Sequence, residues 1–82
     1  MAVYIATFFS HFGASRFKKL CKTAGWTAQV MPVPRDLSSS CGTCVRYEGT
    51  AICPDERMPE EVEQIVEVTD NGYICRHQAA DS

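Results

Sequence analysis

The segment from Pro32 to Cys44 separates two apolar runs and does most to limit how this chain can fold. Proline has no backbone N–H to donate to a sheet, so Pro32 and Pro34 end the first run or place it at a sheet edge. Three serines then lead to Cys41-Gly42, and a second apolar run follows. This composition predicts a bend between two strands, on which the Cys41 thiol is accessible to another molecule.

The rest of the chain alternates between strand and helix patterns. β-Branched and aromatic residues predict four strands, at Val3–Phe9, Trp26–Val33, Thr43–Glu48 and Tyr73–His77. A helix is expected from His11 to Ala24, because Ser10 can cap it and its apolar residues recur at helical spacing. A second helix is expected from Pro59, where proline suits the first turn and an apolar stripe follows.

The predicted order is strand, helix, strand, strand, helix, strand. Two split β-α-β units in this order predict an α+β, ferredoxin-like fold (βαββαβ), with a four-stranded antiparallel sheet and two helices on one face. Residues 35–42 would then connect the second and third strands at one end of the sheet. We expect a single domain over residues 1–77 and a frayed tail over residues 78–82.

Charge and composition narrow the classes of function. The formal net charge of −2 argues against a nucleic-acid partner, which needs clustered Lys and Arg. One local basic cluster consists of Arg16, Lys18, Lys19 and Lys22. Its spacing is that of a solvated helix face, and the alternative is that it docks an acidic partner. The apolar start, Ala2–Phe9, lacks a basic leader and is too short for a membrane span. We therefore expect a cytoplasmic, reducing compartment, in which the cysteines are thiols.

Cys41 is the candidate reactive residue. The thiolate is the nucleophilic form of cysteine, and nearby cations or clustered backbone N–H groups favour it. The candidate cations are Arg35 and Arg46, and the loop residues that could direct N–H groups at the sulfur are Ser38, Ser39, Ser40 and Gly42. Such a thiolate could accept sulfur or selenium from a donor and pass it on. The alternative is that Cys41 is an unreactive turn residue.

The other cysteines leave several alternatives open. Cys44 could resolve a persulfide on Cys41, form a local disulfide, or fill a semi-buried strand position. A strand follows this Cys-x-x-Cys pair where a thioredoxin-like motif has a helix, so that analogy fails. The cysteines could also form a zinc or iron–sulfur site, with His77 as a further candidate ligand. The four cysteines of that site would be Cys41, Cys44, Cys53 and Cys75. Cys21 lies on the apolar stripe of the first helix and is expected in the core.

The residues around Cys41 also form a longer motif. It consists of Pro32-Val-Pro-Arg-Asp-Leu-Ser38, then Cys41-Gly42, then Val45-Arg46. This motif resembles that of a bacterial family of Se/S carrier protein-like domains, whose pattern is Pro-x-Pro-Arg-x-Leu/Ile-Ser-x-x-Cys-Gly-x-x-Leu/Val-Arg. The resemblance implies that sulfur or selenium is carried on Cys41. The chain departs from the family at Cys44, where relatives more often have a small residue such as Ala.

Together, the residues and the resemblance predict a carrier that holds a persulfide or selenosulfide on Cys41. A donor such as a cysteine desulfurase would load it and an acceptor enzyme would unload it, so the protein is a covalent carrier more than an independent enzyme. No cofactor, nucleic-acid or membrane partner is expected. The alternatives are a metal-binding cysteine module, a thiol–disulfide redox protein, and an interaction domain that forms a homodimer through the open face of its sheet.

Overall fold

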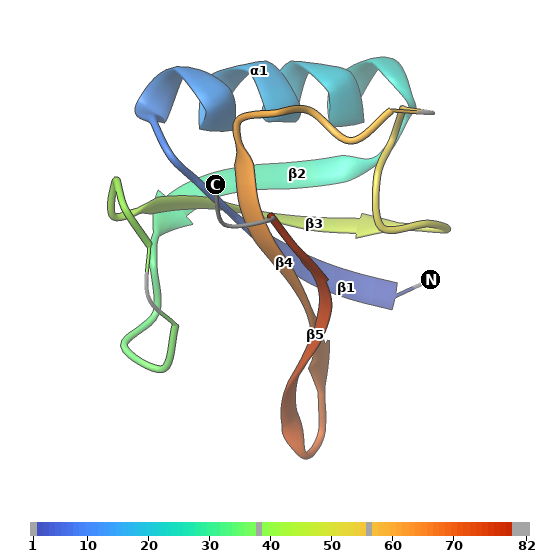
Figure 1. Cartoon of the computed structure of the whole chain (residues 1–82). Coiled ribbons are helices and arrows are strands. Elements are labelled where there is room, and N and C mark those ends of the chain that lie inside the picture. Colours follow the sequence, from blue (N-terminus) through green and yellow to red (C-terminus); the bar gives the residue numbers. More distant parts are fainter. Residues whose placement is uncertain (1, 38, 56, 80–82) are drawn as a thin grey trace.

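A computed structural model describes residues 2–37, 39–55 and 57–79 of the chain. Within these residues, a five-stranded antiparallel sheet of order β2-β3-β1-β4-β5 is covered on one face by one helix (Figure 1). The elements are β1 (Ala2–Phe8), α1 (His11–Thr23), β2 (Thr27–Pro32), β3 (Thr43–Gly49), β4 (Val62–Thr69) and β5 (Gly72–Gln78).

The ferredoxin-like prediction is wrong, because the segment after Pro59 forms strand β4 where a second helix was expected. The apolar residues Val62 and Ile65 have the three-residue spacing of a helix face. The strand achieves this spacing through an irregularity: Phe8 of β1 pairs with Val62, and Thr7 pairs with Gln64, so one residue of β4 is extra. This bulge places Val62 and Ile65 on the same face of the sheet, and both belong to the core beneath α1. The β-bulge therefore produces the same three-residue spacing of apolar residues as a helix face.

The helix α1 is present because its start and end signals are local. The side chain of Ser10 accepts a hydrogen bond from the backbone N–H of Gly13 at 3.2 Å, as an N-cap residue does. At the other end, Gly25 has a φ of +80°, the left-handed conformation that glycine adopts readily. The helix connects β1 to β2, which run parallel because β3 lies between them and is antiparallel to both.

Two hydrophobic clusters lie on opposite faces of the sheet. The larger one packs beneath α1, and its buried residues are Tyr4, Ala6, Phe8, Ala14, Phe17, Cys21, Val45, Tyr47, Val62 and Ile65. The smaller one consists of Ile5, Cys44 and Val66, with Met31, Val33, Leu37 and Val68 packed against it. In Figure 1, residues 33–37, the first part of the β2–β3 connection, and the β4–β5 hairpin extend to the side of the sheet away from α1.

The last strand continues into the segment that was expected to fray. Gln78 belongs to β5, and the backbone N–H of Ala79 donates to the carbonyl of Glu63 at 2.9 Å. Residues 80–82 of the expected tail lie outside the described residues.

Candidate functional site: the thiol loop

Cys41 lies at the end of the β2–β3 connection, just before β3 begins. Its thiol donates to the carbonyl oxygen of Thr43 at 3.5 Å, and Sγ lies 4.0 Å from Oγ of Ser39. The side chain is partly buried and packs against the larger hydrophobic cluster. The sulfur is therefore held at the rim of the core and is neither enclosed nor free in solvent.

Serine hydroxyl groups tie this loop, residues 39–43, to two strands. Oγ of Ser39 donates to the carbonyl of Phe8, the last residue of β1, at 3.2 Å. Ser40 binds the Glu63 carboxylate of β4 twice, through its backbone N–H at 3.1 Å and its hydroxyl at 2.7 Å. The serines of the motif thus position the loop, in addition to being small residues of a bend. Ser38 lies outside the described residues.

The far end of the loop is tied to the start of α1. Oγ1 of Thr43 and Nδ1 of His11, the first residue of α1, lie 2.8 Å apart in a hydrogen bond. Gly42 has a φ of +73°, which side chains other than glycine rarely adopt, and its carbonyl accepts from the N–H of Val33 at 3.1 Å. The ends of β1, α1, β3 and β4 therefore meet around Cys41.

The two predicted cations do not contact the Cys41 sulfur. Arg35 and Arg46 are both exposed, and no hydrogen bond or ion pair joins either to Cys41 within the described part of the chain. Arg46 alternates along β3 with Val45 and Tyr47, which pack beneath α1. Its side chain therefore lies on the face of the sheet opposite to the cluster that Cys41 contacts.

Cys44 is fully buried in the smaller cluster, on the face away from α1. Its thiol donates to the carbonyl of Pro32 at 3.6 Å. Burial first, and the neighbouring Cys41 second, raise the pKa of Cys44 to about 11. In this conformation Cys44 is a protonated, enclosed thiol, and it could resolve a persulfide on Cys41 only if the start of β3 opened.

The four cysteines of the alternative metal site are dispersed. Cys41 and Cys53 pack against the larger cluster, Cys44 belongs to the smaller one, and Cys75 is exposed on β5, where its thiol donates to the carbonyl of His77 at 3.6 Å. In residues 2–37, 39–55 and 57–79, no group of three or more His, Cys, Asp or Glu side chains is placed to hold a metal ion. All five cysteines are free thiols.

Two residues of the site, His11 and Glu63, were not anticipated. His11 reads in the sequence as a solvated residue at a helix start, and Glu63 as part of the second helix. Their contacts with Thr43 and Ser40 bridge 32 and 23 positions of the chain. Only the pairing of β4 with β1 could have indicated the role of Glu63, because that pairing brings the start of β4 beside the loop.

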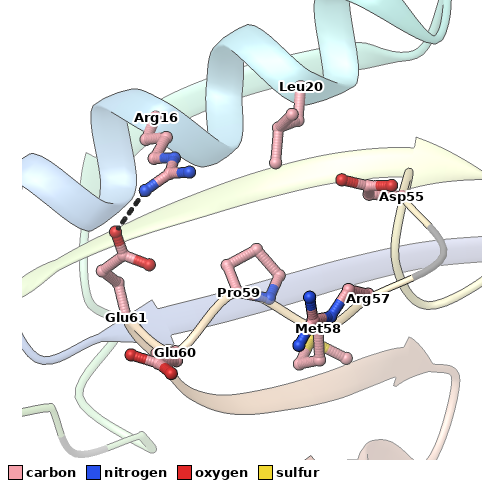
Figure 2. Close-up of a pocket in the computed structure, with 8 residues that line it drawn as sticks. All are labelled: Arg16, Leu20, Asp55, Arg57, Met58, Pro59, Glu60 and Glu61. Atoms are coloured by element: carbon pink, nitrogen blue, oxygen red, sulfur yellow. Dashed lines mark hydrogen bonds and ion pairs between the residues drawn. The ribbon is translucent and has the colours of Figure 1, made fainter.

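A separate hollow of about 590 Å³ lies between α1 and the segment that leads to β4 (Figure 2). Its lining residues are Arg16, Leu20, Asp55, Arg57, Met58, Pro59, Glu60 and Glu61. The guanidinium group of Arg16 forms an ion pair with Glu61 across it at 3.2 Å. The lining carries charges of both signs and no thiol, so this hollow is distinct from the Cys41 loop.

The fold and the loop together define a small α+β domain that presents one partly buried thiol where several elements end. A family model described as "Putative Se/S carrier protein-like" matches residues 3–72, and the chain therefore belongs to this family. The match includes the whole Cys41 loop. Searches of the curated proteins and of the solved structures found no match. In the described part of the chain, no helix has the length and apolarity that a bilayer crossing requires.

Proposed function

We propose that this protein carries sulfur or selenium covalently on Cys41, in the cytoplasm, between a donor enzyme and an acceptor enzyme. The observation that supports this most directly is the Cys41 sulfur itself, held at the rim of the core between a serine hydroxyl and a backbone carbonyl. The family match supports the same chemistry, since a carrier implies enzymes that load and unload it.

The loading step needs no oxidant or reductant from outside the two proteins. The Cys41 thiol loses its proton to solvent, and the thiolate attacks the outer sulfur of a donor persulfide. A new S–S bond forms on Cys41, the S–S bond of the donor breaks, and the donor cysteine leaves as a thiolate that takes up a proton. Unloading is the same exchange, with an acceptor thiolate attacking the outer sulfur of the Cys41 persulfide. Selenium would be carried in the outer position in the same way.

The surroundings of Cys41 contain both favourable and unfavourable charges for an anionic sulfur. The N-terminal end of α1, which His11 anchors to the loop, carries the positive end of the helix dipole, and the first turn has no acidic residue. The hydroxyl of Ser39 lies 4.0 Å from the sulfur and now donates to the carbonyl of Phe8, so it would have to leave that carbonyl to donate to a thiolate. Against these, the carboxylate of Glu63 lies beside Ser40, where two hydrogen bonds from that residue satisfy it.

The roles foreseen for Arg35 and Arg46 stay predictions. Both guanidinium groups are exposed. Because Arg46 lies on the opposite face of the sheet, it can reach the sulfur only if the loop rearranges. Arg35 is part of the β2–β3 connection itself, and we propose that it is the arginine that approaches the sulfur when a partner is bound.

The test is intact-protein mass spectrometry after incubation with a cysteine desulfurase and cysteine. We expect the wild type to gain the mass of one sulfur atom, and Cys41→Ser to gain none, because the nucleophile is lost. The matched control is Cys75→Ser, which removes an exposed thiol on β5 and is expected to load like the wild type. An adduct that survives Cys41→Ser would contradict the proposal, as would a wild type that gains sulfur neither from the desulfurase nor from inorganic polysulfide.

A further inference from the structure

Two aromatic side chains stand in solvent at the start of α1. Phe12 is 70% exposed and Phe9 is 50% exposed, although Phe8 and Phe17 of the same region are fully buried. Phe12 belongs to the first turn of α1 and lies outside its buried face, which consists of Gly13, Ala14, Phe17 and Cys21. Exposed aromatic rings contribute little to the stability of the fold, and rings gathered in one place mark surfaces that bind a partner.

These two aromatic residues are neighbours in the sequence of residues that bind the thiol loop. Phe9 follows Phe8, whose carbonyl accepts the hydrogen bond from Ser39. Phe12 follows His11, whose ring is bonded to Thr43. Both exposed rings therefore belong to residues that are sequence neighbours of the groups that hold the Cys41 loop in place.

The exposed face of α1 continues from Phe12 as a positive surface. The helix has no acidic residue, and its four cations are exposed. They are Arg16, Lys18, Lys19 and Lys22. Arg16 is paired with Glu61 yet remains 61% exposed, and none of the three lysines forms an ion pair with another described residue. The whole chain has a net charge of −2, so this positive surface is a local feature that complements an acidic one.

We infer that Phe9, Phe12 and the exposed face of α1 as far as Lys22 form the surface on which the sulfur-donating protein docks. The donor would present an acidic surface with an apolar pocket for Phe12, and its persulfide would then reach Cys41. This inference rests on the proposed carrier function. A lipid surface fits less well, because a membrane-bound helix needs a continuous apolar stripe, whereas Phe12 is followed on this face by polar and charged residues.

The experiment compares two ways of loading Cys41. One uses a cysteine desulfurase at subsaturating concentration with cysteine, and the other uses inorganic polysulfide, a small donor that needs no docking surface. We expect Phe12→Ala to slow loading by the desulfurase about tenfold, as loss of a central aromatic contact does, and to leave loading by polysulfide unchanged. The double variant Lys18→Glu/Lys19→Glu is expected to slow the desulfurase reaction as well, most at low salt.

Ile74→Ala is the matched control, since Ile74 is 44% exposed on β5, outside the inferred surface. Desulfurase rates equal to the wild type in both α1 variants would overturn the docking inference and leave the carrier function standing. Slower loading by polysulfide as well would also overturn it, because the defect would then lie at the thiol. Loading of the wild type by polysulfide alone would overturn the choice of donor. Loading by neither donor would refute the carrier function itself.

A second measurement tests whether the surface binds membranes. If the wild type binds anionic phosphatidylglycerol vesicles, and the lysine variant does not bind them but keeps normal desulfurase rates, the surface is a membrane-binding one instead.

Discussion

Single residues in the core of this protein differ in how well their polar groups are satisfied. Thr7 is 1% exposed, and its hydroxyl has no hydrogen-bond partner in the described part of the chain. It pairs across the sheet with Cys44, whose thiol does have a partner, the carbonyl of Pro32. An unpaired buried hydroxyl costs free energy because it loses its hydrogen bonds to water on folding.

We therefore expect Thr7→Val to raise the free energy of unfolding by about 1 kcal/mol, since valine keeps the shape of threonine and removes the hydroxyl. Urea unfolding followed by circular dichroism measures this change. Thr7→Ser is the control, because it keeps the hydroxyl and removes the methyl group, and it should destabilise. A Thr7→Val variant less stable than the wild type would mean that the hydroxyl has a partner in solution.

At the scale of elements, two glycines allow neighbouring segments to approach closely. A Cβ atom on Gly13 of α1 would lie 2.4 Å from Cβ of Glu61, just before β4. A Cβ atom on Gly49, the last residue of β3, would lie 2.5 Å from the ring of Trp26. That ring stacks on Tyr47, with centroids 6.0 Å apart and planes 3° from parallel. The absence of a side chain at these two glycines therefore lets α1 pack against the residue before β4, and lets Trp26, the residue before β2, pack against the end of β3.

Gly49→Ala is expected to displace the Trp26 ring and to lower the free energy of unfolding by about 1–3 kcal/mol, the usual cost of overpacking. The readouts are urea unfolding by circular dichroism and the fluorescence of the single tryptophan. In a Trp26→Leu background the same glycine substitution should cost less, because the ring that it meets is gone. An equal cost in both backgrounds would show that the Trp26 contact is not the cause.

At the scale of the whole molecule, both faces of the sheet enclose a protonated thiol. Burial, with a smaller effect of Cys53, raises the pKa of Cys21 to about 12 in the larger cluster. Burial likewise raises the pKa of Cys44 to about 11 in the smaller one. Burial also raises the pKa of Tyr47, whose hydroxyl donates to the carbonyl of Ile52. The folded state as a whole therefore favours the protonated forms of these groups.

This preference predicts a loss of stability in alkali. An unfolded cysteine ionises near pH 8.5, whereas the folded Cys44 keeps its proton up to about pH 11. Within this window the unfolded state binds fewer protons, so stability falls as pH rises, by up to about 1.4 kcal/mol per pH unit for each thiol. Below the window these thiols contribute no pH dependence.

Urea unfolding at neutral pH and at about pH 10 measures this loss of stability. The free energy of unfolding should fall less between the two pH values for Cys44→Ala than for the wild type. Cys75→Ala, at an exposed position, controls for removal of a cysteine. An unchanged loss in Cys44→Ala would contradict the prediction.

The parts of this protein that the sequence predicted correctly depend on neighbours in the chain. The helix α1 was predictable because its apolar stripe lies within it, and Ser10 and Gly25 lie within two residues of its ends. The sequence also predicted that successive side chains of β3 lie on opposite faces of the sheet, which separates Arg46 from Val45. The family was recognised from a motif within residues 32–46, and the family match over residues 3–72 confirms that family.

What only the tertiary structure decided depends on residues far apart in the chain. The bulge of β4 exists because Val62 and Gln64 pair with consecutive residues of β1, and no local pattern distinguishes its spacing from that of a helix. For the same reason, the sequence could not show that His11 and Glu63 hold the thiol loop. Local sequence determines backbone preference and the order of apolar residues. Which hydrogen bonds complete the loop around Cys41 is decided when distant strands meet, because only that meeting brings their polar groups together.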